Sequence, residues 1–225
     1  MHADPDTTHP PAAPAALATL ATLATLATLA TPVTRMGRLR EATRLVHART
    51  EALLPLLSDS LTTATYVRVL EVFFGFYAPL EPALAAAAAS SGAWEATDDR
   101  QKVPLLLADL LALGKTRDDI ARLRRCATLP RVSSASHAIG VLYVVEGATL
   151  GGRVIGRHLR DVLGLDAARG AAFFGGYGDR TGAMWTRFSR HVETSPRIDI
   201  DAAACAAVET FEDLLAWLGV ELACP

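Results

Sequence analysis

The sequence is poor in cysteine and nearly neutral in charge, and both features exclude classes of protein. Its 225 residues contain three cysteines, and the formal net charge is −2. The cysteines are odd in number and far apart, so neither a disulfide framework nor a paired-cysteine metal site is indicated, and we expect a cytoplasmic protein. Nucleic acids and anionic membrane surfaces are bound by concentrated positive charge, so we expect neither as a partner.

The motifs of several enzyme classes are also missing. The sequence has no His-Glu-x-x-His, no Gly-x-Ser-x-Gly and no phosphate-binding loop, although it contains the glycine-rich stretches LGG and FFGG. A zinc protease, a serine hydrolase and a P-loop nucleotidase are therefore not indicated. No segment alternates apolar and polar residues with a period of two, so no strand is predicted. We expect an all-α protein, folded as an irregular multi-helix bundle.

Residues 1–34 differ in composition from the rest and are predicted to be a low-complexity, disordered tail. They include LATLATLATLATLAT, in which leucine recurs at every third position. That spacing drifts about 60° per step around a helix, so it forms no steady apolar face. A signal peptide is disfavoured because Asp4 and Asp6, rather than basic residues, precede the apolar run, and the threonines weaken a membrane span. Residues 35–225 are the expected folded domain.

Apolar residues at helical spacing predict the helices of this domain. The expected ranges are Gly37–Leu57, Leu61–Ala89, Val103–Leu113, Asp118–Cys126, Ala138–Leu159, Ala183–Val192 and Asp201–Leu218. Pro79 and Pro82 are expected to bend the second helix. The glycine-rich segment Gly164–Gly182 is predicted to be a loop.

The helix predicted over Ala138–Leu159 carries five glycines. Each glycine costs a helix roughly 0.8–1 kcal/mol relative to alanine, so the segment gives up about 4–5 kcal/mol of helix propensity. Gly140, Gly147 and Gly151 recur at i, i+7 and i+11 and share one stripe. A stripe without side chains admits either a closely packed second helix or a flat ligand, and both interpretations stay open.

His47 is the candidate metal ligand. It lies on the apolar face of the first predicted helix, where a lone histidine is most often a core residue. Glu51, four residues on, is within reach of the imidazole. A carboxylate that accepts from one ring nitrogen fixes the tautomer and presents the other nitrogen to a metal. Elsewhere, the hydroxyl and guanidinium groups of Tyr143, Arg187 and Arg190 suit ligand carboxylates.

Two stretches resemble the heme oxygenase family. LREATRLVHARTE (Leu39–Glu51) resembles the family's proximal helix, and YVVEGATLGGRV (Tyr143–Val154) resembles its distal helix, closest to the bacterial, biliverdin-producing branch. FGFYAPLE (Phe74–Glu81), which lies between these two stretches, is similar to the corresponding segment of the family. The two helices occur in the family's order, about 100 residues apart, and the resemblance covers about Arg35–Leu218.

The resemblance implies a fold with heme between the proximal and distal helices. His47 is then the axial ligand of the heme iron, Glu51 is its hydrogen-bond partner, and Arg40 pairs with a heme propionate. Gly147 and Gly151 match the distal glycines, where the helix lies over the porphyrin.

Further assignments follow at the edge of the heme. Arg187 falls near the family's C-terminal propionate-binding arginine, with Arg190 as the alternative register. Tyr143 is implied as another propionate partner and Phe211 as a wall of the heme pocket.

One position departs from the family. Many members have an aspartate directly after the first distal glycine, which organises water around the bound oxygen, whereas this chain has Ala148. Thr149, or backbone carbonyls freed at the glycines, would then hold that water.

The activity implied is that of a heme oxygenase, an oxidoreductase of heme catabolism. Heme b is both cofactor and substrate. It is cleaved with O2 and electrons from an external reductase or ferredoxin, and the products are biliverdin, CO and Fe2+. Ala148 motivates an alternative, a non-catalytic heme carrier or sensor on the same fold. A third class, the all-α enzymes that cleave thiamin-like compounds, needs a cysteine beside carboxylates, and none of the three cysteines lies in such a cluster.

Overall fold

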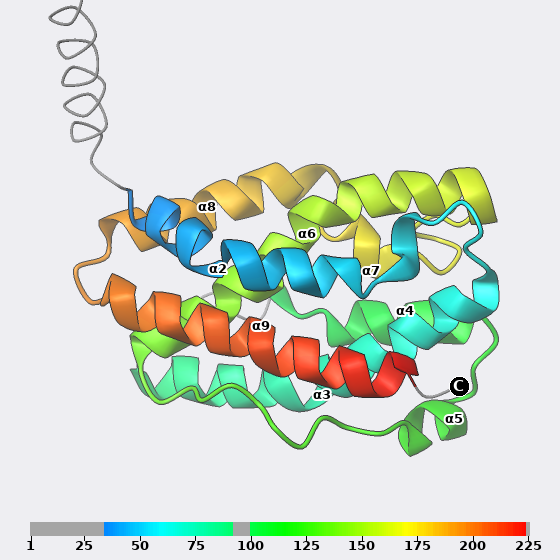
Figure 1. The fold of residues 1–225 in the computed structure, drawn as a ribbon, viewed down its shortest axis with the longest axis horizontal. Coiled ribbons are helices and arrows are strands. Elements are labelled where there is room, and N and C mark those ends of the chain that lie inside the picture. Colours follow the sequence, from blue (N-terminus) through cyan, green and yellow to red (C-terminus); the bar gives the residue numbers. More distant parts are fainter. Residues whose placement is uncertain (1–33, 92–99, 224–225) are drawn as a thin grey trace, which may run out of the picture. The chain divides into compact units, whose positions relative to one another are not determined.

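The computed structural model describes residues 34–91 and 100–223, and within these ranges every regular element is a helix. The predicted tail lies outside the described residues, apart from Thr34. The elements are α2 (Arg35–Ala52), η1 (Pro55–Leu57), α3 (Thr63–Ser91), α4 (Val103–Ala112), α5 (Arg117–Arg122), α6 (Ala135–Leu163), α7 (Ala172–Gly175), η3 (Gly178–Arg180), α8 (Thr181–Thr194) and α9 (Ile200–Ala223). Figure 1 shows the long helices packed as an irregular bundle.

The glycine-bearing helix α6 is central to the packing of the bundle. It contacts α3, α7, α8 and α9, and α9 in turn packs along α2 (Figure 1). The tightest approach is at Gly140, where an added Cβ would lie 2.3 Å from the carbonyl oxygen of Ala203 and 2.7 Å from the Cβ of Ala206. Glycine on α6 and alanine on α9 therefore let these two backbones meet.

Helix α2 ends earlier than its spacing predicts, at Ala52 rather than Leu57. The cause is Pro55, because the residue before a proline is pushed out of the helical region. Leu54 accordingly has an extended backbone, with φ −94° and ψ 117°, and Pro55 opens the short helix η1.

Helix α3 runs through Pro79 and Pro82 without ending. A proline inside a helix leaves the carbonyl four residues earlier without its usual donor. For Pro79 that carbonyl belongs to Gly75, and the backbone N–H of Cys126 donates to it at 3.0 Å. The linker before α6 thus supplies the hydrogen bond that the proline removes.

The segment Gly164–Gly182 is predicted to be a loop, but it contains the short helices α7 and η3. A side chain distant in sequence accepts hydrogen bonds from the first backbone N–H groups of α7. The Asp109 carboxylate accepts from the N–H groups of Ala172 and Phe173 at 2.7 and 2.8 Å. This cap is a tertiary contact with α4, so no local pattern within the segment could indicate it.

Within residues 34–91 and 100–223, two helices are long and apolar enough to cross a membrane by length and composition alone. They are Thr63–Ala87 and α6, and 56% of the apolar window of each is buried inside the fold. Core helices of globular proteins have the same character, and here both helices carry residues of the hydrophobic core.

Candidate functional site

A cavity of about 430 Å³ opens between α2 and α6. Aromatic and aliphatic side chains from the surrounding helices line much of it; they are Phe73, Tyr77, Phe173, Phe174, Trp185, Phe211 and Leu214. Pockets of this size with apolar walls and few polar groups are typical of small-molecule and cofactor sites.

On the α2 wall, the His47 side chain lines the cavity and is half exposed, at 50%. Its Nδ1 lies 3.5 Å from Oε2 of Glu51, one turn along the helix. The ring of Phe211 stands edge-on to the imidazole, with centroids 5.2 Å apart. No described residue hydrogen-bonds to Nε2 of His47, so this nitrogen is available to a metal.

On the α6 wall, Gly147 and Gly151 expose bare backbone to the cavity. A Cβ added at either position would meet nothing within 4 Å. Gly152, one residue further on, is packed instead, because its Cβ would lie 2.5 Å from the carbonyl oxygen of Phe174. The stripe predicted as one surface is therefore divided. Gly140 serves helix packing, while Gly147 and Gly151 face the open cavity.

Arg40 and Tyr143 lie at a polar end of the cavity, where a pocket of about 350 Å³ adjoins it. Both residues, with Trp185, line the cavity and the pocket alike. Arg190 also lines the pocket, whereas Arg187 lines neither space among the described residues. The structure thus places Arg190, rather than Arg187, in the adjoining pocket, which Arg40 and Tyr143 also line.

Thr149 does not line the large cavity among the residues described. Its hydroxyl donates to the backbone carbonyl of Glu146 at 2.6 Å, and the residue lines a second, small cavity that Ala148 also lines. Glu51, Phe211, Gly147 and Gly151 all line the large cavity.

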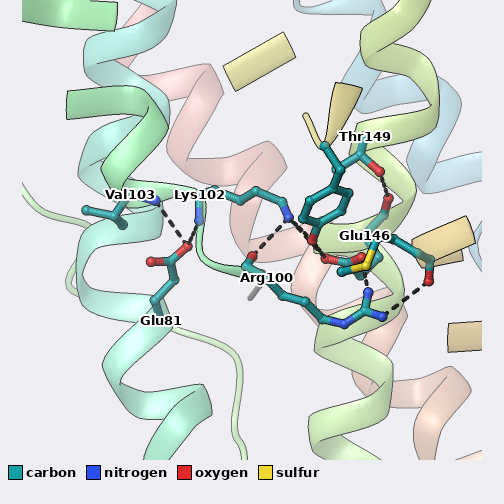
Figure 2. A network of polar contacts seen from close by, with 8 residues as sticks. Glu81, Arg100, Lys102, Val103, Glu146 and Thr149 are labelled. Carbon is teal, nitrogen blue, oxygen red and sulfur yellow. Dashed lines mark hydrogen bonds and ion pairs between the residues drawn. The ribbon is translucent and has the colours of Figure 1, made fainter. Parts of the chain in front are cut away.

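Sequence reasoning missed a buried cluster of charged side chains beside α6 (Figure 2). Glu146 is 1% exposed and pairs with the guanidinium of Arg100 and with Nζ of Lys102, the latter at 3.1 Å. The hydroxyl of Tyr177 donates to the same carboxylate at 2.6 Å. A glutamate between apolar residues of a core helix was the one local signal, because a buried charge needs partners.

The chain leading to α4 is anchored on the other side of this cluster. The Glu81 carboxylate accepts from the backbone N–H groups of Lys102 and Val103, the latter at 3.2 Å (Figure 2). Burial lowers the pKa of Lys102, and the neighbouring Glu146 carboxylate opposes that shift. Lys102 is thus held at both its backbone and its side chain.

The fold and the cavity together define a class of protein. They form an all-helical domain with one imidazole on a cavity wall, bare backbone on another, and cations at the edge. These features fit heme, whose iron takes an imidazole ligand, whose flat ring can lie against a wall without side chains, and whose propionates pair with arginine.

Comparison with known proteins names the family. The heme oxygenase family model matches residues 34–213. A heme oxygenase of Xanthomonas campestris pv. campestris is 37% identical over 123 residues, which are 52% of this chain and 68% of that protein. The chain therefore belongs to the heme oxygenase family, a family of oxidoreductases. The resemblance inferred from the two helices is confirmed.

Solved structures agree on the fold. The NO- and CO-bound heme oxygenase of Neisseria meningitidis superposes with a TM-score of 0.70 at 20% identity, covering 86% of this chain and 94% of that one. The heme oxygenase of Leptospira interrogans superposes with a TM-score of 0.67 at 17% identity, covering 83% of this chain and 99% of that one. The predicted all-α fold of heme oxygenase type is confirmed.

Proposed function

We propose that this protein binds heme b between α2 and α6 and cleaves it, with O2 and externally supplied electrons, to biliverdin, CO and Fe2+. The observation that carries the proposal is a single cavity lined by His47 on α2 and by the bare backbone of Gly147 and Gly151 on α6. The electron donor is a separate reductase or ferredoxin, and the compartment is the cytoplasm. When bound, heme supplies both the iron that activates O2 and the ring that is oxidised.

His47 serves as the iron ligand through Nε2. The carboxylate of Glu51 beside Nδ1 favours the tautomer that carries its proton there. The edge-on ring of Phe211 limits rotation of the imidazole. These two neighbours hold the ligand in one orientation before heme arrives, which reduces the entropy lost on binding.

The backbone of α6 leaves the opposite face of the ring open to a small reactant. Side chains at Gly147 and Gly151 would project into the cavity, since neither Cβ position is filled by protein. Gly147 and Gly151 would hold the ring against backbone alone, and heme bound there would supply both the iron for O2 and the carbon that is oxidised.

Arg40, Tyr143 and an arginine of α8 orient the ring by binding its propionates. The position of Arg190 in the adjoining pocket favours it over Arg187 for this role. Which propionate each residue binds sets the rotation of the ring in its plane, and hence which meso carbon lies in the open space.

A second candidate function is a heme carrier or sensor that has lost catalysis, favoured by Ala148 in place of the aspartate that many members carry. Reconstitution with hemin, ascorbate or a ferredoxin–reductase system, and air separates the two. Loss of the Soret band with growth of a biliverdin band in the red is the result expected of the enzyme. A heme spectrum that persists unchanged under reductant and air would identify the carrier.

A further inference from the structure

The large cavity has a polar end and an apolar end. Arg40 and Tyr143 lie at the polar end, where they also line the adjoining pocket. Ile155 lines the same cavity twelve residues beyond Tyr143 on α6. At a rise of 1.5 Å per residue, that separation is about 18 Å along the helix. The cavity therefore runs along α6 from a cation and a phenol to aliphatic side chains.

The apolar end lies where α6 meets the chain that follows α2. Nε2 of His158, on α6, is 3.0 Å from the carbonyl oxygen of Ser58, the residue after η1. Ile155 precedes His158 by about one helical turn, and Leu54 directly precedes η1. Both Ile155 and Leu54 line the cavity. They therefore come from two different walls of this end.

Exposed aliphatic side chains gather at the apolar end. Within residues 34–91 and 100–223, seven large aliphatic residues are exposed; they are Leu45, Leu53, Leu57, Leu150, Val154, Val162 and Val220. Four of them belong to the segments just described, and we call Leu53, Leu57, Leu150 and Val154 the apolar rim. Isolated exposed leucines and valines are ordinary on protein surfaces, whereas a group of them at the edge of a cavity marks a binding surface.

The apolar rim continues the lining of the cavity. Leu150 belongs to both, because it lines the cavity and is 38% exposed. Leu53 and Val154 are the sequence neighbours of Leu54 and Ile155, and they are 42% and 62% exposed. The apolar lining therefore extends from inside the cavity to the surface of the protein.

The two ends of the cavity fix which edge of a bound heme meets the apolar rim. This step rests on the proposed function, in which Arg40 and Tyr143 bind the propionates. The ring edge opposite the propionates then faces Leu54 and Ile155. In heme b that edge carries only short vinyl and methyl groups. A longer aliphatic substituent at the same edge would lie along the apolar rim.

We propose that the apolar rim is a subsite for an aliphatic chain carried by the substrate. The substrates then include hemes in which an isoprenoid or alkyl chain replaces a vinyl group on the edge opposite the propionates. The chain binds because it removes the exposed side chains of the rim from water, along with its own surface. This recognition is non-directional, so the affinity depends on the length of the chain and not on polar groups along it.

The test compares hemin with a heme that carries a hydroxyfarnesyl chain in place of one vinyl group. Both are titrated into the full chain in the same buffer and detergent, and quenching of tryptophan fluorescence gives two dissociation constants. We expect the wild-type chain to bind the chain-bearing heme at least about tenfold more tightly than hemin. A tenfold preference requires the burial of only about 55 Å² of apolar surface.

The variant Leu57→Ser/Val154→Ser removes two side chains of the rim. Neither residue lines the cavity, so we expect the affinity for hemin to change by less than about twofold. The preference for the chain-bearing heme falls below about threefold, because less apolar surface is buried. The ratio of the two dissociation constants within each variant removes the general tendency of a more apolar ligand to bind protein.

Val220→Ser is the matched control. Val220 resembles Val154 in residue type and exposure, 55% against 62%, and lies on α9 outside the lining of the cavity. We expect this variant to keep the wild-type preference. An equal preference in the wild-type chain and in Leu57→Ser/Val154→Ser overturns the inference, as does an equal loss in Val220→Ser.

Two further measurements separate other occupants of the apolar rim. Cosedimentation with vesicles of phosphatidylcholine and phosphatidylglycerol reports a lipid surface, and sedimentation velocity reports a second copy of the chain. Loss of either association in Leu57→Ser/Val154→Ser, with the preference for the chain-bearing heme unchanged, overturns the inference. In these cases hemin is still bound and cleaved. Failure of the wild-type chain to bind hemin would instead overturn the proposed function.

Discussion

At the scale of single residues, the site depends on how a few side chains are oriented by their neighbours. Thr43 and Thr50 lie on the buried face of α2 beside His47, and their hydroxyls donate to the carbonyls of Leu39 and Val46 at 2.9 Å each. These bonds satisfy the buried polar atoms within the helix itself. The polar partner of His47 is Glu51, so the imidazole keeps a nitrogen for the ligand.

Replacing His47 by alanine abolishes turnover, because no other described imidazole lines the cavity. The hemin complex is expected to lose its six-coordinate histidine spectrum, and added imidazole to restore part of it. Optical spectroscopy and biliverdin formation measure both effects. His137→Ala is the control, since His137 contacts Ser133 outside the cavity. A His47→Ala variant with full activity would show that another residue binds the iron.

Arginine substitutions in α8 test which residue binds a propionate. Arg190→Ala weakens hemin binding by about tenfold or more, the effect of losing one charge-assisted hydrogen bond. Arg187→Ala, on the same helix, is expected to change the affinity less than about twofold, in the range of a surface substitution. Fluorescence quenching by hemin gives both dissociation constants. The opposite order would assign the propionate to Arg187.

At the scale of elements, the glycines of α6 face two different surroundings, the backbone of neighbouring helices and the open cavity. Gly140 and Gly152 admit the backbones of α9 and α7, with added Cβ atoms at 2.3 and 2.5 Å from carbonyl oxygens. Gly147 and Gly151 line the open cavity instead. The glycines of α6 are therefore present for two different reasons. Substitutions at the two kinds of position are expected to change the free energy of unfolding of the ligand-free protein in opposite directions.

Gly151→Ala raises the free energy of unfolding of the ligand-free protein by roughly 0.5–1 kcal/mol, since alanine favours the helix and its methyl meets open space. Gly140→Ala lowers it by about 1–3 kcal/mol because the methyl overlaps the backbone of α9. Urea unfolding measures both. Equal effects at the two positions would contradict the division of the stripe.

A bulky residue at the ligand-facing position separates stability from function. Gly151→Leu fills the space over the ring, so we expect inactivity or a shift towards peroxidase-like products. Wild-type biliverdin yield from this variant would count against a distal helix that lies close over the heme.

At the scale of the whole molecule, the site is assembled from helices distant in sequence. The large cavity takes residues from α2, α3, α6, α7, α8 and α9. Helix α7 contributes Phe173 and Phe174 to its wall and is itself held by Asp109 of α4. Heme binding should therefore stabilise the entire domain, because a ligand that binds only the folded state adds its binding free energy to folding.

Removal of residues 1–33 tests whether the domain is independent of the predicted tail. Thr34 must be retained, because its hydroxyl caps α2 by accepting from the N–H of Gly37 at 2.9 Å. We expect the shortened chain to bind hemin with unchanged affinity and to show the same rise in melting temperature on hemin addition. Calorimetry of both chains measures this, and weaker binding by the shortened chain would assign the segment a part in the site.

The sequence by itself determined the features that depend on residues a few positions apart. Helical spacing indicated the helices, and the offset of four between His47 and Glu51 placed carboxylate and imidazole on one face. Local chemistry also explains why α2 ends at Ala52, because Pro55 follows, although apolar spacing alone predicts a helix up to Leu57. Such features follow from hydrogen bonding and side-chain geometry within one helix, so they can be predicted without knowledge of the tertiary structure.

The tertiary structure alone decided the features that need surfaces distant along the chain to meet. It gave Gly140 and Gly151 different surroundings and placed Arg190, instead of Arg187, in the pocket that adjoins the cavity. It also brought Asp109 to the first N–H groups of α7. It also joined Lys102 and Tyr177 on Glu146, across 44 and 31 residues of sequence. The physical reason is that a buried charge or a bare stretch of backbone takes its role from what packs against it, and the helical pattern of one segment does not specify that neighbour.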